Sequence, residues 1–297
     1  MKTPKRLEPL IEDGLIDEVL RPLMSGKEAA VYVVRCGTAL RCAKVYKEAN
    51  KRSFRQAAEY QEGRKTRNSR QTRAMAKGTR YGRKEAEEAW QNAEVSALFR
   101  LAGAGVRVPK PYDFLDGVLL MEMVTDGQGD AAPRLNDVDL TAEQAREYHG
   151  FVISQIVLML CTGLVHGDLS EFNVLLGPDG PVIIDLPQAV DAAANNHAFS
   201  MLERDVNNMA QYFGRFAPEL KATRYAKEMW ALYKAGTLEP STALTGTFAE
   251  ADVSADVNAV MREIETAKRD EARRQAARAE QDAPAGPPEE PTPPWMR

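Results

Sequence analysis

The sequence predicts an α+β fold of two lobes, a small β-rich lobe followed by a larger helical lobe. Two short segments rich in β-branched residues, 29–36 and 39–46, lie close together near the start. One helical segment (85–101) and one apolar strand (118–124) follow them, and helical spacing dominates the rest of the chain. With 297 residues, the chain is long enough to divide a sizeable core between two lobes.

The order of these segments divides the chain into five parts. The predicted parts are an N-terminal helical segment (1–20), an N-lobe (21–124), a C-lobe (125–253), a charged helix (254–281) and a Pro-rich tail without fixed structure (282–297).

The N-terminal elements are predicted from apolar spacing and turn residues. Residues 8–20 are amphipathic and predict a helix, and residues 23–26 are predicted to form the first strand. The segments 29–36 and 39–46 form a β-hairpin pattern around the turn residues Gly37 and Thr38. The stretch MSGKEA (24–29) therefore lies at the turn between the first two strands.

A strongly basic stretch, residues 50–84, interrupts the N-lobe. It contains twelve lysines and arginines but only two glutamates, with Ser, Thr, Gly and Gln between them. We interpret it as a solvated, flexible insertion. The alternative is an arm, Lys51–Lys84, that contacts RNA or the ribosome, because clustered cations bind phosphate backbones by releasing counterions.

The helices that follow have recognisable ends. Residues 85–101 have helical spacing and end at Gly103. Thr141 can cap a long helix with Gln144 three residues on, as in a capping box, and this helix is predicted to run to Thr162. Further helices are predicted at 198–213 and 218–235.

The most informative stretch is LVHGDLSEFNVLL (164–176), followed by PVIID (181–185). Its Asp168 precedes Asn173 by five residues, the spacing of a kinase catalytic loop. The apolar flanks 174–176 and 182–184 predict short buried strands that present polar residues at their ends. A buried histidine capping a loop would explain His166 alone, but the combination favours phosphoryl transfer.

The residue types suit this chemistry. Asp168 would orient the attacking hydroxyl and accept its proton. Asn173 and Asp185 would hold Mg²⁺ over the phosphates, because this hard cation prefers oxygen ligands.

Composition indicates in which cellular compartment the protein works and which partners it lacks. The net charge of −4 implies no particular partner. The longest apolar run, 151–160, is far shorter than the roughly 20 residues of a membrane span, and the N-terminus resembles no signal peptide. Cys36, Cys42 and Cys161 lack metal-like spacing and are interpreted as reduced core residues. We therefore expect a cytoplasmic protein with no membrane partner.

Several motifs together resemble the RIO family of atypical protein kinases, most closely its first branch, from Leu15 to Phe213. The motifs that carry this resemblance are SGKEA (25–29), CAKVY (42–46), HGDLSEFN (166–173), IIDLPQ (183–188), NHAF (196–199) and RD (204–205). The resemblance implies a protein-kinase-like fold with a nucleotide bound in the cleft between the lobes.

The resemblance to the RIO family also implies which residues bind the nucleotide. The implied residues are Ser25, Gly26, Lys27, Glu28, Ala29, Val31, Lys44, Met121, Glu122 and Val124. Gly26 lets the backbone turn toward phosphates, and Ser25 and Lys27 can donate to them. The hinge would meet the adenine edge through the Glu122 carbonyl and the Val124 N–H.

Lys44, in the predicted strand 39–46, needs an anion beside it, because uncompensated burial of its charge is costly. The phosphates and a helix glutamate would supply that anion for Lys44, and we select Glu94 over Glu87 and Glu88. Asp205 is expected to support the catalytic loop through hydrogen bonds without contacting substrate.

The resemblance implies an ATP- and Mg²⁺-dependent serine/threonine protein kinase and ATPase, with Mn²⁺ as a possible replacement metal. It implies phosphorylation of a protein substrate or of the chain itself, and an aspartyl-phosphate on Asp185. Gly167 stands where ordinary kinases have arginine, so no phosphate-sensing activation loop is expected. Pro187 departs from the commoner RIO residue.

Two other functions stay open on the sequence. The HGD loop and the following IID are shared with small-molecule kinases that resemble the aminoglycoside and choline phosphotransferases. The basic stretch would suit a nucleotide-gated factor that binds RNA or the ribosome, in which slow hydrolysis switches the conformation.

Overall fold

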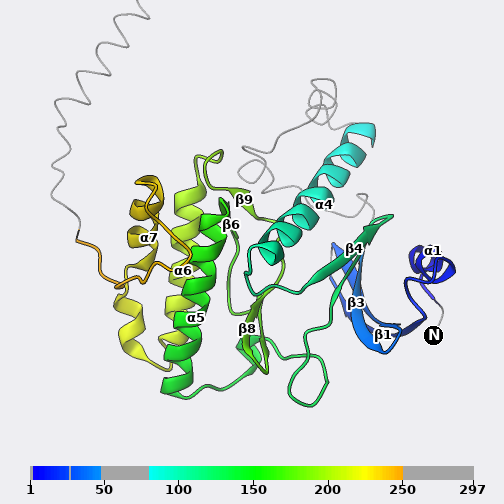
Figure 1. The fold of residues 1–297 in the computed structure, drawn as a ribbon, viewed down its shortest axis with the longest axis horizontal. Coiled ribbons are helices and arrows are strands. Elements are labelled where there is room, and N and C mark those ends of the chain that lie inside the picture. Colours follow the sequence, from blue (N-terminus) through cyan, green and yellow to red (C-terminus); the bar gives the residue numbers. More distant parts are fainter. Residues whose placement is uncertain (1–2, 27, 48–79, 250–297) are drawn as a thin grey trace, which may run out of the picture. The chain divides into compact units, whose positions relative to one another are not determined.

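An antiparallel β-sheet forms the N-lobe (Figure 1). The computed structural model describes residues 3–26, 28–47 and 80–249, and within these ranges the sheet has five strands in the order β1-β2-β3-β5-β4. The strands are β1 (Glu18–Ser25), β2 (Ala29–Cys36), β3 (Ala39–Tyr46), β4 (Pro111–Leu115) and β5 (Val118–Glu122).

The hairpin predicted from sequence is confirmed in both strands. β2 and β3 pair without a register shift from Ala29 opposite Tyr46 to Cys36 opposite Ala39. Gly37 makes the turn at φ +62°, a conformation that glycine adopts at little cost. β5 ends at Glu122, which pairs with Arg41, so the predicted strand 118–124 is two residues too long.

The N-terminal helix is shorter than predicted. A 3-10 turn, η1 (Lys5–Leu7), leads into α1 (Glu8–Glu12), which ends just before Gly14 at φ +70°. Residues 18–20, predicted as helix, belong to β1, where Glu18 and Val19 pair with β2. The misleading apolar spacing has a physical origin: Leu10 in α1 and Ile16 in the following turn are buried together against the sheet.

The long helix α4 (Arg80–Gly103) lies beside the sheet (Figure 1). It buries Val95, Leu98 and Leu101 in the main core. The helix begins five residues before the predicted start, so residues 80–84 belong to it and not to the basic insertion. Residues 50–79 of that insertion lie outside the described part of the chain.

Three α-helices build the described part of the C-lobe: α5 (Ala142–Cys161), α6 (Ala198–Phe213) and α7 (Tyr225–Lys234), which pack against one another (Figure 1). The capping box at Thr141 is confirmed, because its side chain accepts from the Gln144 N–H and Gln144 reciprocates. The α6 prediction is confirmed at both ends. The predicted helix 218–235 divides into η4 (Pro218–Ala222) and α7, because Thr223 is extended.

Two pairs of short strands lie in the segment between α5 and α6. β6 (Leu164–Val165) pairs with β9 (Val190–Asp191), and β7 (Val174–Gly177) forms a hairpin with β8 (Gly180–Ile183). A 3-10 turn, η3 (Leu135–Asp137), precedes α5. No described helix combines the length and the apolarity of a bilayer crossing. The predicted charged helix 254–281 and tail 282–297 lie outside the described residues.

One histidine is buried among aromatic rings in the C-lobe core. His149 on α5 is 1% exposed, and its ring lies 5.6 Å from that of Phe213 and 5.8 Å from that of Tyr225. Its Nε2 has no hydrogen-bond partner among the described residues. Burial lowers the pKa of His149 from 6.5 to about 4, because the charged form would lose its hydration.

This lowered pKa predicts a loss of stability in acid. The unfolded chain binds a proton at His149 near pH 6.5 but the folded chain only near pH 4, so stability falls as the pH falls through this window. We expect a loss of about 2 kcal/mol between pH 8 and pH 5 from this residue. Urea unfolding of wild type and His149→Leu at both pH values measures it. An equal pH dependence in both proteins would contradict the assignment.

Candidate active site

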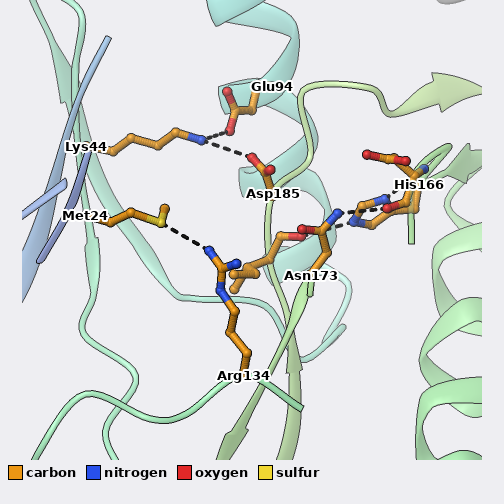
Figure 2. A network of polar contacts seen from close by, with 9 residues as sticks. Met24, Lys44, Glu94, Arg134, His166, Asn173 and Asp185 are labelled. Atoms are coloured by element: carbon orange, nitrogen blue, oxygen red, sulfur yellow. Dashed lines mark hydrogen bonds and ion pairs between the residues drawn. The ribbon is translucent and has the colours of Figure 1, made fainter. Parts of the chain in front are cut away.

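A lysine from the sheet meets two carboxylates from other elements. Lys44 lies in β3 between the buried residues Ala43 and Val45. Its Nζ donates to Glu94 on α4 and lies 3.5 Å from Oδ1 of Asp185, beyond the end of β8 (Figure 2). The structure therefore brings together three predicted site residues that are far apart in the sequence.

The burial of this cluster makes its charges interdependent. The side chains of Lys44 and Glu94 are 13% and 5% exposed, while that of Asp185 is 51% exposed. Burial alone would lower the pKa of Lys44, but Glu94 and Asp185 outweigh it and raise the pKa. The two carboxylates therefore keep the lysine charged and hold its Nζ between β3, α4 and the segment after β8.

The predicted catalytic loop follows β6 and is held by its own histidine. His166 is 2% exposed, and its Nδ1 accepts the Asp168 N–H at 3.3 Å. Its Nε2 lies 3.1 Å from the carbonyl of Ile184. An acceptor at Nδ1 and a carbonyl at Nε2 require the tautomer with its proton on Nε2. His166 thereby joins the loop to the segment that carries Asp185.

Asp205 on α6 supports the same loop, as predicted. Its carboxylate accepts the Gly167 N–H at 2.7 Å and the Leu169 N–H at 2.9 Å. The residue is 1% exposed, and this burial raises the pKa of Asp205 to about 6 although the two N–H donors oppose the shift.

Asp168 itself is exposed, while its backbone N–H and carbonyl are held by His166 and Asn173. Partial desolvation raises the pKa of Asp168, and the nearby charge of Asp185 adds to the rise, while His166 and Arg204 oppose it. A raised pKa makes a carboxylate a better proton acceptor.

Asn173 directly precedes β7, and Asp185 lies two residues beyond the end of β8, the strand that pairs with β7 (Figure 2). The Ile184 N–H donates to the Asn173 carbonyl at 2.9 Å, which ties the two segments together. Asp185 has φ +67°, a conformation rare outside glycine. Such a strained backbone is typical of functional sites, where the surrounding structure enforces it.

The donor set of these two residues fits a hard cation. The Asn173 Nδ2 donates to the Asp168 carbonyl at 2.8 Å, so its Oδ1 faces the other way. Across the described ranges, no group of three His, Cys, Asp or Glu residues could hold a metal. An amide oxygen and a carboxylate suit Mg²⁺ that takes its other ligands from phosphates and water.

The predicted nucleotide loop joins β1 to β2. The Gly26 N–H donates to the Ala29 carbonyl at 2.9 Å, which closes the turn. Ala29 and Val31 are buried on β2, whereas Ser25, Gly26 and Glu28 are exposed. Lys27 lies outside the described residues.

Two cations that touch this region were missed in the sequence. Lys47 Nζ donates to the Ser25 Oγ at 3.1 Å and to the Gly26 carbonyl at 2.6 Å, so it braces the loop. Arg134 reaches the Met24 sulfur at 3.1 Å from the segment after the hinge (Figure 2). The hairpin register places residue 47 opposite the loop, which could have indicated Lys47; no sequence signal indicates Arg134.

The predicted hinge residues lie at the end of β5 and just beyond it. The Glu122 side chain forms a bidentate pair with Arg107, with both distances 2.8 Å, and also accepts the Lys110 N–H. Hydrogen bonding to Arg107 lowers the pKa of Glu122. Met121 is partly buried, and the Val124 carbonyl accepts the Ala132 N–H at 3.0 Å. These contacts fix the strand end on which the hinge depends.

A RIO domain model matches residues 30–226. A RIO-type serine/threonine-protein kinase Rio1 from Haloferax volcanii is 35% identical over 69% of this chain and 67% of its own length. One of the same name from Methanocaldococcus jannaschii is 32% identical, covering 72% and 69%. The Schizosaccharomyces pombe serine/threonine-protein kinase rio1 is 31% identical over 72% of this chain but only 42% of its own length.

The match thus spans about two thirds of the archaeal relatives and under half of the yeast relative. Among solved structures, a kinase-domain crystal structure aligns with 73% of this chain and 70% of its own, at 14% identity and a TM-score of 0.42. The domain match covers both the lysine strand and the loop of Asp168 and Asn173, and on this ground the chain belongs to the RIO family of serine/threonine kinases.

Proposed function

We propose that this protein is an ATP- and Mg²⁺-dependent serine/threonine kinase that also hydrolyses ATP. The observation that carries the proposal is the convergence of Lys44, Glu94 and Asp185 beside a loop with the Asp168–Asn173 spacing, in a chain of the RIO family. Mn²⁺ would serve in place of Mg²⁺, because both accept oxygen ligands.

In the proposed reaction, each residue has a separate task. Lys44, kept in place by Glu94, binds the α- and β-phosphates of ATP. Asn173 and Asp185 hold the metal, which neutralises charge on the phosphates when bound. Asp168 accepts the proton of a serine or threonine hydroxyl as its oxygen attacks the γ-phosphorus, and the bond to the leaving ADP oxygen breaks.

The hydrolytic mode uses a carboxylate as the acceptor. A carboxylate oxygen of Asp185 attacks the γ-phosphorus, forming an acyl phosphate as ADP leaves, and water then releases inorganic phosphate and restores Asp185. The exposure of the Asp185 side chain (51%) supports this role, because a nucleophile must be reached by the phosphate.

Family membership weighs against the small-molecule kinase. The named relatives are protein kinases, and the SGKEA and SEF segments differ from those of aminoglycoside and choline phosphotransferases. The substrate is therefore proposed to be a protein or the chain itself. Contact of Lys51–Lys84 with RNA or the ribosome stays a prediction from composition, and most of that segment lies outside the described residues.

Intact-mass analysis after incubation with Mg·ATP tests the proposal. We expect ADP release, together with a phosphoryl group on the protein that hydroxylamine removes and a second population that resists hydroxylamine and acid. The first reports an acyl phosphate and the second phosphoserine or phosphothreonine. A non-hydrolysable ATP analogue is the control. No ADP and no mass change would refute the proposed function, and the absence of the hydroxylamine-sensitive population alone would refute the Asp185 intermediate.

A further inference from the structure

Side chains of α6 form hydrogen bonds with the backbone of Gly167 and Leu169, the residues on either side of the predicted base Asp168. Arg204 Nη2 donates to the Gly167 carbonyl, and Asn208 Nδ2 donates to the Leu169 carbonyl at 3.0 Å. Asp205 accepts the N–H groups of the same two residues. Positions 204, 205 and 208 lie on one face of the helix, so a single rigid element supplies all four hydrogen bonds.

The backbone of Asp168, which lies between Gly167 and Leu169, also has both of its polar groups hydrogen-bonded. The Asp168 N–H donates to His166 Nδ1, and the Asp168 carbonyl accepts from Asn173 Nδ2. Every backbone N–H and C=O group from Gly167 to Leu169 therefore has a side-chain partner. Segments without ladder hydrogen bonds ordinarily rely on water for several of these groups, so this arrangement fixes the backbone unusually well.

We propose that Arg204 and Asn208 are positioning residues that fix Asp168 for proton transfer, an inference that rests on the proposed function. Gly167 replaces the arginine through which ordinary kinases sense a phosphorylated loop, and its φ of +83° favours glycine. Arg204 brings a guanidinium from α6 to the same peptide. The catalytic loop is therefore assembled without a phosphorylation event.

The kinetic consequence is a change in kcat and not in nucleotide binding. The carbonyls that accept from Arg204 and Asn208 belong to Gly167 and Leu169, and neither of these is among the residues proposed to bind ATP. Loss of either donor leaves a carbonyl without its partner and lets Asp168 move. A displacement near 1 Å from the productive geometry costs about 100-fold in rate, so a partial loss of restraint should cost about 10- to 100-fold.

Steady-state ATP turnover of Arg204→Met and Asn208→Leu tests the inference. We expect kcat to fall about 10- to 100-fold with the KM for ATP changed less than about twofold, and Arg204→Lys to recover most of the loss. The matched controls are Asn207→Leu, the exposed neighbour on the same helix, and Arg146→Met, which removes an exposed ion pair with Glu219. Both controls should keep wild-type kcat.

Hydrogen–deuterium exchange separates this inference from the proposed function. The peptide covering residues 164–173 should exchange faster in Arg204→Met and Asn208→Leu than in the two controls, whether or not the protein turns over ATP. If the wild-type protein does not turn over ATP, the proposed function is refuted. The exchange data would still test whether Arg204 and Asn208 restrain the loop. Wild-type kcat in both variants, or exchange equal to that of the controls, would overturn the inference.

Discussion

Replacing Asp185 with asparagine should reduce ATP turnover by at least about 10⁴-fold, more than any other single substitution in the site. The change removes the one carboxylate of the proposed metal pair, and charge stabilisation of this kind usually contributes more to catalysis than any other effect. It also removes the proposed phosphoryl acceptor. Asparagine tolerates the φ of +67° at this position nearly as well as aspartate, so the backbone stays in place and the loss reports the missing carboxylate and not a change of fold.

The comparison that gives this result meaning is Asp168→Asn. Proton transfer contributes about 10²–10⁴-fold to catalysis, so this variant should keep a small but measurable rate, above that of Asp185→Asn. ADP release under saturating Mg·ATP measures both. Asp179→Asn, an exposed aspartate at the turn between β7 and β8, is the matched control and should behave as wild type. Wild-type turnover in either site variant would defeat its assigned role.

Local patterns predicted much of the fold because they depend on neighbouring residues. Alternation and a two-residue turn predicted the β2–β3 hairpin, and the Thr141–Gln144 pair predicted the start of α5, since the interactions that stabilise these elements span only a few residues. The helix predicted over 8–20 was wrong beyond residue 12. Apolar residues there are buried by the sheet, a tertiary effect that short-range spacing does not encode.

In the candidate site too, contacts between residues close in the sequence were predictable and contacts between distant residues were not. The spacing of Asp168 and Asn173 is local, and the structure places the two side by side, with 2.8 Å between the Asn173 Nδ2 and the Asp168 carbonyl. The contacts of Arg204 and Asn208 with the catalytic loop join residues 37 and 39 positions apart. Nothing in either segment alone indicates those pairs, because they exist only once α6 has packed beneath the loop.

The buried pair of Lys44 and Glu94 provides the second large effect, in which stability and activity should respond differently. Lys44→Met leaves the Glu94 carboxylate buried without its partner, and Glu94 Oε2 already has no hydrogen-bond partner among the described residues. Breaking such a pair costs about 3–5 kcal/mol of unfolding free energy. Turnover should fall at least about 10²-fold, because the proposed phosphate contact is lost.

The double variant Lys44→Met/Glu94→Leu separates the two effects. Replacing both members of a buried pair with apolar residues is often neutral, so most of the lost stability should return. Turnover should not return, because no cation is restored for the phosphates. Urea unfolding and ADP release on the same samples measure both, and the exposed pair Arg35–Glu18 is the control, where the same cycle should give less than about 1 kcal/mol. A double variant as unstable as the single variant would mean that the two charges do not compensate each other. A double variant with restored turnover would mean that Lys44 serves the fold and not the nucleotide.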